Sequence, residues 1–370
     1  MRRWLPRSLL VAVTMMMLGM GPALAVGPFG PAVSVVDPGC RVEEDYSDAT
    51  RGPDGVVRGF YGYWVNPGPA CFDPSLPLWY FEGSGDTWTR IKSPYRGRVL
   101  AVTQDATAVY LLYAATDGIR ITKRTAAGFT PGRVISPVGI GDIQHGDVIA
   151  SGGTWWAVWA EPTNPEVISS SRELYQAKTF GTDQRRRRLT TNRVDDVEPT
   201  LVLRPGGGAA MFWTRGNSFP NQTASDIRKA TSADGAWSSA PFATAGTDNT
   251  APDAAVAGRT TYVAWGRDGA VKIGDYVGGW RFVTLNDPAA PEGTPKLAVS
   301  GGQLVVGWNR LDPAILAWRV RVAERVGGTW TTVTLGAASD QLVHRVVSTD
   351  GRATVLLSKW TRLAARTETS

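Results

Sequence analysis

Short apolar segments that end at or near an aromatic residue recur along the chain, separated by Gly-rich turns. They cover residues 60–64, 109–113, 155–159, 210–213, 262–265, 304–308 and 353–357. When the last residue of each segment is taken as equivalent, successive copies lie about 43 to 54 residues apart. A repeat of this length suits one four-stranded blade of a β-propeller.

The same local order of elements recurs within the later repeats. An inner strand such as 199–203, 252–256 or 295–299 comes first, followed by a Gly-rich turn and the aromatic strand. Gly and Trp occur at the start of the outermost strand, as in Gly235-Ala236-Trp237 and Gly279-Trp280. No long segment shows apolar residues at helical spacing, so the pattern excludes a helical fold.

The end of the chain predicts a closed ring of sheets. Only 13 residues follow Leu357, too few to complete a four-stranded blade. Residues 32–36 are apolar and supply the missing strand if the ring closes, and closure also hides the exposed edges of the first and last sheets. We therefore predict an all-β protein, a β-propeller of four-stranded blades. Seven blades are favoured, with six as the alternative because the first repeat is the least regular.

The amino terminus has the order of a secretory signal peptide. Arg2, Arg3 and Arg7 precede an apolar run over 9–20 and a small-residue stretch that ends at Ala25. The run is shorter than the roughly 20 residues needed to span a bilayer, and no later stretch is apolar enough. We predict a signal peptide over 1–25 and a single propeller domain over 26–370, secreted or located in the periplasm or cell envelope.

Two cysteines, Cys40 and Cys71, lie in a segment rich in Gly and Pro. In an oxidising compartment this pair predicts one disulfide. Two thiols with no nearby His do not complete a zinc site, since His145 and His344 are remote in sequence. The sequence therefore calls for no cofactor.

The formal net charge is +6, and its one concentrated run of positive charge is Arg185 to Arg188. Such a run suits an acidic glycan, a phosphate-rich polymer or an anionic membrane surface. The favoured interpretation is a solvated outer edge strand whose charges discourage edge-to-edge pairing. A single run without interleaved aromatic residues argues against a nucleic-acid partner.

One repeat resembles a known family. Residues 197–242 combine Glu198-Pro199-Thr200 with a central aromatic strand and the segment Ser232-Ala233-Asp234-Gly235-Ala236-Trp237. This pattern is similar to a repeat of the sialidase superfamily, the bacterial neuraminidase repeat (BNR, Asp-box) β-propeller proteins. The segment is one residue shorter between Asp and Trp than the family's Asp box. Because that box has a structural role even in active members, the resemblance implies a fold rather than an activity.

The resemblance also implies what catalysis would need. An active sialidase clamps a carboxylated sugar with three arginines, attacks it with a Tyr that a Glu activates, and moves protons with an Asp. The nearest stretch to the early Arg motif, Tyr95-Arg96-Gly97-Arg98-Val99, is a loose match. The sequence does not identify a catalytic set.

The loops that enter the inner strands converge at one mouth of the channel, and they are acidic. The candidate ligand-binding residues at this mouth are Asp142, His145, Asp147, Arg193, Asp195, Asp196, Arg215, Asp248, Asp253, Asp340 and His344. Their carboxylates suit sugar hydroxyls, an acid and base pair, or a calcium ion. The competing explanation is that Asp favours turns and strand starts.

We therefore expect an exported, monomeric, noncatalytic recognition protein for a glycan, a cell-envelope component or a protein partner. The alternative is a sialidase-like glycoside hydrolase acting at the channel mouth. The third hypothesis is a structural or envelope-assembly protein. A fold of this kind serves binding, hydrolysis and scaffolding alike.

Overall fold

A computed structural model describes most of the chain after the amino-terminal region. It covers residues 33–36, 47–62, 77–137, 145–164, 170–179, 186–216, 224–233, 236–243, 248–285, 292–300, 303–335, 341–349, 352–359 and 362–367. The predicted signal peptide over 1–25 and the predicted disulfide between Cys40 and Cys71 lie outside the described residues.

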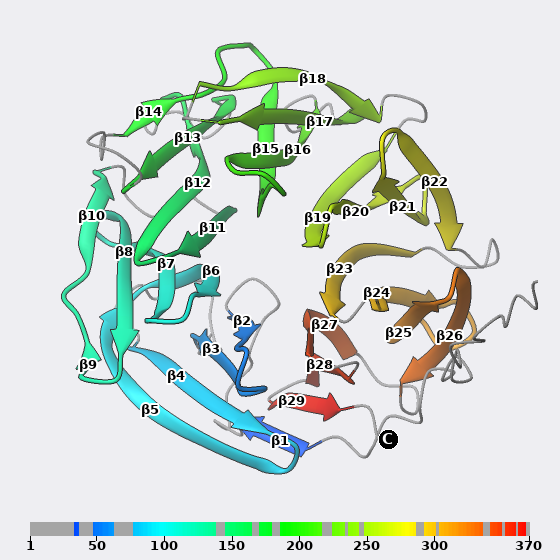
Figure 1. Ribbon diagram of the computed structural model, residues 1–370, viewed down its shortest axis with the longest axis horizontal. Helices are drawn as coiled ribbons and strands as arrows, with labels where there is room; N and C mark the ends of the chain where they lie inside the picture. Colours follow the sequence, from blue (N-terminus) through cyan, green and yellow to red (C-terminus); the bar gives the residue numbers. More distant parts are fainter. Residues whose placement is uncertain are drawn as a thin grey trace, which may run out of the picture.

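The described strands form seven antiparallel sheets arranged around a central axis (Figure 1). Their innermost strands are β2, β6, β11, β15, β19, β23 and β27, each of which contacts the next, and β27 contacts β2. The ring is thus closed, and the predicted all-β propeller of four-stranded blades is confirmed. One sheet carries a short additional strand, β9, beside β8.

The first three blades, in chain order, consist of these strands: β2 (Ser47–Arg51), β3 (Val57–Tyr61), β4 (Pro77–Ser84) and β5 (Thr87–Arg96); β6 (Arg98–Gln104), β7 (Val109–Ala115), β8 (Gly118–Thr125), β9 (Gly128–Phe129) and β10 (Arg133–Ser136); and β11 (Gly146–Ser151), β12 (Thr154–Pro162), β13 (Arg172–Lys178) and β14 (Arg187–Arg188).

The remaining blades consist of β15 (Asp195–Leu203), β16 (Ala209–Gly216), β17 (Ser225–Ser232) and β18 (Ser238–Ala243); β19 (Asn249–Ala257), β20 (Thr260–Arg267), β21 (Ala270–Tyr276) and β22 (Trp280–Leu285); β23 (Glu292–Ser300), β24 (Gln303–Asp312), β25 (Ala317–Val326) and β26 (Thr329–Leu335); and β27 (Gln341–Thr349), β28 (Arg352–Lys359), β29 (Arg362–Thr367) and β1 (Val33–Val36).

The last blade takes its outer strand from the amino-terminal end of the described chain. β1 pairs antiparallel with β29, with Val33 opposite Ala365 and Ser34 opposite Ala364 (Figure 1). The predicted donor strand over 32–36 is therefore confirmed, and the described strand begins at Val33. This pairing joins strands from opposite ends of the described chain in one sheet and covers the edge of β29 that would otherwise be free.

The periodic aromatic residues pack between blades. Trp159, Trp213 and Trp308 are among the largest fully buried side chains. The strand register places Tyr61, opposite Ser47, at the corresponding position of the first blade, whereas Trp64 lies outside the described residues. Large aromatic side chains suit this role because each buries a wide apolar surface against the neighbouring sheet.

The segment that resembles an Asp box contributes an inter-blade contact through its Trp. The Trp237 ring lies 5.0 Å from the Trp156 ring of the preceding blade. Both indole N–H groups donate to the same acceptor, Gln176 Oε1, at 2.8 Å. Ser232 is buried nearby, while Asp234 and Gly235 are outside the described residues.

Arg187 and Arg188 of the arginine run form an outer edge strand, β14, the position favoured from the sequence, whereas Arg185 lies outside the described residues. The charges of the run are partly neutralised by buried carboxylates. Arg186 bonds to Glu161, and the Arg188 guanidinium lies 3.0 Å from Glu173. Because both glutamates are inaccessible to solvent, these pairs fix the strand to its blade rather than leave a free basic surface.

Within the described ranges, the structure contains no helix with the length and hydrophobicity required to cross a bilayer.

Candidate functional site at the channel mouth

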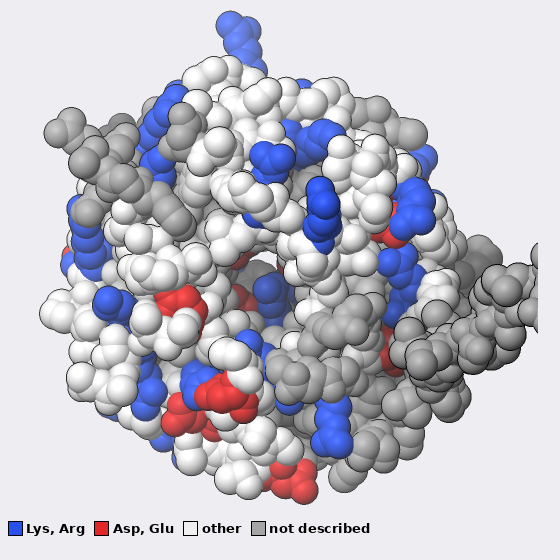
Figure 2. Space-filling model, in the orientation of Figure 1, with Lys and Arg blue, Asp and Glu red and all other residues white. Residues whose placement is uncertain are grey.

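A polar pocket of about 170 Å³ lies where the inner strands meet at the centre of the ring. All seven blades contribute to it. Its lining residues are Ser47, Asp48, Val99, Leu100, Ala101, His145, Gly146, Asp147, Glu198, Pro199, Thr200, Ala251, Pro252, Asp253, Thr294, Lys296 and Arg345. Figure 2 shows acidic and basic side chains together inside the central opening.

Seven of these lining residues occupy the same structural position in their blades. The second strand of each blade carries one anchor residue, which is aromatic in six blades and Leu357 in the seventh. Each of the seven lining residues pairs with the residue directly before this anchor, as Asp147 does with Val158 before Trp159. Around the ring they are Asp48, Ala101, Asp147, Thr200, Asp253, Lys296 and Arg345. The ring therefore carries acids on three alternate blades, small side chains between them, and two adjacent bases.

Each of the three aspartates fastens its own blade to the following one. Asp48 Oδ2, Asp147 Oδ2 and Asp253 Oδ2 accept hydrogen bonds of 2.6 Å from the backbone N–H groups of the following inner strand, which belong to Val102, Leu201 and Leu297. These are short, charge-assisted bonds of the kind that fix a carboxylate firmly. One oxygen of each aspartate is therefore committed to the fold.

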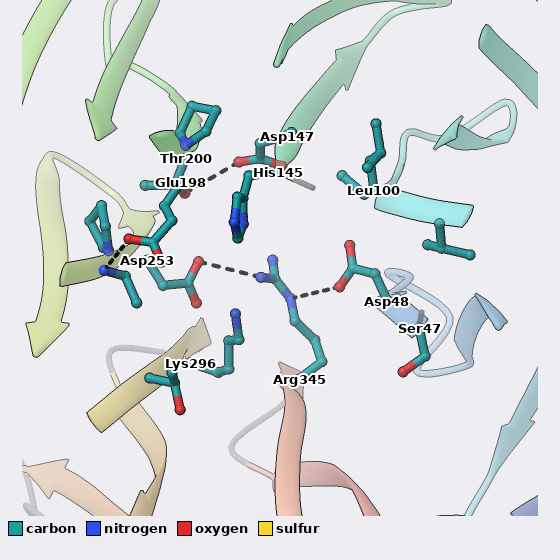
Figure 3. Close-up of a pocket in the computed structure, with 17 residues that line it drawn as sticks. Ser47, Asp48, Leu100, His145, Asp147, Glu198, Thr200, Asp253, Lys296 and Arg345 are labelled. Carbon is teal, nitrogen blue, oxygen red and sulfur yellow. Dashed lines mark hydrogen bonds and ion pairs between the residues drawn. The ribbon is translucent and has the colours of Figure 1, made fainter. Parts of the chain in front are cut away.

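The guanidinium of Arg345 lies between two of these carboxylates (Figure 3). Its Nε is 3.6 Å from Asp48 Oδ1, and its NH1 donates to Asp253 Oδ1 at 3.3 Å. Asp48 and Asp253 thus use one oxygen for the adjacent blade and the other for Arg345. This arrangement holds a cationic donor at the centre of the pocket.

Burial and mutual interaction shift the ionisation of this cluster. Burial, together with the charges of Asp48 and Asp253, raises the pKa of Asp147 to about 7 despite the Leu201 N–H bond and the charge of Arg345. Burial also raises the pKa of Asp48, against the opposing effect of Arg345. Burial alone would lower the pKa of Arg345, but Asp253, Asp48 and Asp147 outweigh it and keep this residue charged.

Three consecutive blades place a strained bulge at the pocket. Glu198, Ala251 and Thr294 have φ angles of 52°, 50° and 47°. All three line the pocket and fall at irregularities in the pairing of the first two strands. Backbone of this kind costs free energy in non-glycine residues and tends to occur beside functional sites, where it redirects side chains. Glu198 Oε2, for example, accepts from Ala251 N at 2.7 Å on the next blade.

Three of the predicted site residues, His145, Asp147 and Asp253, line the pocket. Three others do not belong to it. Asp196 is buried inside its own blade, where it accepts from Trp213 Nε1 and from two nitrogens of Arg215 at 2.7, 2.7 and 3.0 Å. Asp195 is also buried and accepts from Arg172 N at 2.7 Å. The prediction of a channel-mouth role for Asp195, Asp196 and Arg215 is therefore wrong, because Asp196 and Arg215 hold each other within one blade and Asp195 is bonded to β13 of the preceding blade.

The other predicted residues are also outside the pocket lining or outside what the structure describes. Asp248 accepts from Ser225 Oγ at 3.3 Å at the edge of its blade, and Arg193 is exposed. Neither lines the pocket. Asp142 and Asp340 lie outside the described residues, and for His344, which belongs to β27, only the backbone is described.

Asp48, Lys296 and Arg345 line the pocket but were not among the residues predicted from the sequence. A signal for them existed, because each residue of the ring of seven stands 12 or 13 positions before the aromatic anchor or its counterpart. Asp48 is found in this way only if Tyr61 is the anchor of the first blade. The choice of Trp64 displaced the count by three residues.

Among the residues that the structure describes, no three His, Cys, Asp or Glu side chains are grouped so that they could hold a metal ion. Calcium binding, which the acidic entry loops suggested, stays a prediction.

Comparisons with known proteins find similarity in structure but not in sequence. No protein-family model matches the sequence, and a search of curated proteins finds no match. The structure is similar to a Penicillium chrysogenum alpha-L-arabinanase complexed with arabinobiose, at 16% sequence identity and a TM-score of 0.54, covering 77% of this chain and 94% of that chain.

Two further solved structures differ in function from the arabinanase. One is the Aleuria aurantia lectin in complex with alpha-methyl-L-fucoside, at 12% identity and a TM-score of 0.51, covering 81% of this chain and 96% of that chain. The other is the phage phi92 endosialidase, at 10% identity and a TM-score of 0.54, covering 93% of this chain and 69% of that chain. At such low identity the similarity establishes the β-propeller fold, and the narrower resemblance to BNR repeats is not confirmed.

Proposed function

We propose that this protein recognises a glycan at the mouth of its central channel without cleaving it. The observation that carries the proposal is the ring of equivalent positions, which brings carboxylate acceptors and cationic donors from separate blades into one pocket. Hydroxyl groups both donate and accept hydrogen bonds, so a sugar is complementary to fixed donors beside fixed acceptors. The small volume of the pocket suits an end group of a glycan rather than a length of chain.

A noncatalytic role is favoured by how the aspartates are used. The oxygens of Asp48 and Asp253 are divided between the next blade and Arg345. Asp147 accepts from Val148 N at 2.7 Å with Oδ1 and from Leu201 N with Oδ2. Carboxylates bound in this way stabilise the fold and are poorly placed to transfer protons.

Glycoside hydrolysis is the second candidate, and one observation favours it. Asp147 has a pKa of about 7, so near neutral pH it is partly protonated beside two other carboxylates. Neighbouring acids with different protonation states are the usual arrangement for acid and base roles in glycosidases.

Glycan-array binding by the purified protein, with and without calcium, tests the first candidate. Lys296 is the best position for a variant, since it lines the pocket without fastening one blade to the next. We expect Lys296→Gln to weaken binding about tenfold through loss of a charged donor, whereas Lys272→Gln, on the outer part of a blade, leaves it unchanged. Unchanged binding by Lys296→Gln contradicts the proposed site.

A panel of fluorogenic glycosides tests the second candidate. If the wild type cleaves a glycoside and Asp147→Asn does not, hydrolysis becomes the favoured function.

Amino-terminal sequencing of the protein recovered from its natural compartment tests the proposed export, with Val26 expected as the first residue.

A further inference from the structure

A second depression, here called the groove, has a volume of about 510 Å³ and lies between the first two blades. It is formed by the end of β5, the turn between β7 and β8, and the segment that leads into β10. It shares no residue with the channel pocket. Its volume falls within the range of roughly 300 to 1,000 Å³ that is typical of small-molecule sites.

The polar edge of this groove is an aspartate and arginine pair with fixed geometry. Arg120 Nε donates to Asp117 Oδ1 at 2.9 Å, and Arg120 NH2 donates to Asp117 Oδ2. Arg120 NH1 also donates to the Gly132 carbonyl at 2.7 Å. The hydrogen bond from Arg120 lowers the pKa of Asp117, so the carboxylate is ionised at neutral pH. The Asp117 side chain is 54% exposed and so remains able to accept further bonds.

A group of aromatic rings that support one another underlies the apolar side of the groove. The Tyr95 ring lies 5.5 Å from Tyr113 and 5.7 Å from Phe129, with a nearly perpendicular arrangement in the second pair. The Tyr95 hydroxyl donates to the Thr130 carbonyl at 2.5 Å. These contacts fix the rings, but Tyr95 and Tyr113 are only 5% and 3% exposed, so the accessible apolar side of the groove is formed by the half-buried Phe129 and the exposed Pro94 and Pro131.

From this combination we infer that the groove is a second saccharide-binding site, which rests on the proposed function in taking a glycan as its ligand class. A sugar ring has an apolar C–H face and an edge of hydroxyl groups. The apolar side formed by Pro94, Phe129 and Pro131 matches the face, and Asp117 with Arg120 supplies an acceptor and a donor for neighbouring hydroxyls. A second site on the same molecule allows a branched or polymeric glycan to be held at two points, which strengthens binding without new contacts at either site.

Nuclear magnetic resonance of the full protein separates the two sites, because they carry different reporter residues. The chain has 10 tyrosines and two histidines. Ring signals of Tyr95 and Tyr113 report on the groove, and the imidazole of His145 reports on the channel. Each is assigned by its own Tyr→Phe or His→Gln variant. The probes are the methyl glycosides of L-arabinose, L-fucose, D-galactose and D-glucose, and we expect saturable shifts of the tyrosine signals with at least one, at millimolar affinity.

Matched variants give the control. Asp117→Asn and Arg120→Lys each weaken the tyrosine titration about tenfold. The pair Asp54 and Arg58 is also bidentate, with Arg58 NH1 and NH2 donating at 2.9 and 2.6 Å, and has similar exposure, but lies outside the groove. Asp54→Asn and Arg58→Lys should therefore leave the titration unchanged, and thermal melting checks that all four variants fold.

Each outcome separates the two proposals. Tyrosine shifts without a His145 shift support the groove and count against the channel site. A His145 shift alone supports the channel and overturns the groove. The groove is also overturned if no probe moves the tyrosine signals, or if the Asp117 and Arg120 variants titrate like the wild type.

Discussion

Asp147 Oδ2 accepts a 2.6 Å hydrogen bond from the backbone N–H of Leu201, which lies on the next blade. The same carboxylate lines the channel pocket and has a pKa near 7. One side chain therefore links the stability of the ring to the ionisation of the candidate site, and this link has a measurable consequence.

We predict that Asp147 makes the protein less stable as pH rises from about 4 to about 7. Its folded pKa of about 7 lies above the ordinary value of 3.8, so the folded state binds the proton more tightly than the unfolded state. The stabilising contribution is complete below the ordinary value and is lost as pH rises through the folded value. Asp147→Asn should abolish the part of the pH dependence that comes from this carboxyl group. Free energies of unfolding measured by denaturant titration at pH 4 and pH 8 test this.

The difference between wild type and Asp147→Asn should change by no more than a few kcal/mol over that range, because each pKa unit corresponds to about 1.4 kcal/mol. Parallel pH profiles of the two proteins would contradict the raised pKa.

The closing strand β1 provides the second prediction. Neighbouring N–H groups in an antiparallel strand point in opposite directions, so one of Val33 and Ser34 faces β29. The double variant Val33→Pro with Ser34→Pro removes that donor, and we expect a loss of about 1 to 3 kcal/mol and a lower melting temperature. The double alanine variant keeps both donors and serves as the control. If both variants melt together, β1 does not close the ring.

Gln176 provides the third prediction. Its Oε1 accepts from two indole N–H groups, those of Trp156 and Trp237, on adjacent blades. Gln176→Leu leaves both donors without this acceptor, and we expect a loss of about 2 to 4 kcal/mol in denaturant unfolding. Gln176→Glu keeps an acceptor oxygen and should recover part of the loss. If Gln176→Leu is as stable as the wild type, this contact does not help to hold the third and fourth blades together.

Gly118 provides the fourth prediction. Its φ is +132°, and an added Cβ would meet the Ser136 carbonyl oxygen at 2.0 Å. Gly128 has a similar φ of +114° with nothing within 4 Å of the added atom. Both alanine variants carry backbone strain, but only Gly118→Ala adds the collision, so it should be about 2 kcal/mol less stable than Gly128→Ala in thermal or denaturant unfolding. Similar losses in the two variants would show that the strand near Ser136 moves aside.

The periodic part of the sequence determined the fold. Apolar strands ending in Trp159, Trp213 and Trp308 recur at nearly constant spacing, and each must bury the same aromatic anchor against the adjacent sheet. That requirement is local and repeated, so the blade, the inner strands and the donor strand over 33–36 could be predicted.

The tertiary structure decided which polar residues share the channel. Asp196 and Asp253 look alike in sequence, since both lie in the acidic segments where the chain enters an inner strand. Asp196 is held by Trp213 and Arg215 of its own blade, whereas Asp253 meets Arg345 from a strand 92 residues away. Strand register and bulges set which face a side chain takes, and a one-residue change reverses it. Composition and spacing carry no such information, so the location of the pocket followed from the sequence, but its acids, its bases and the groove beside Asp117 did not.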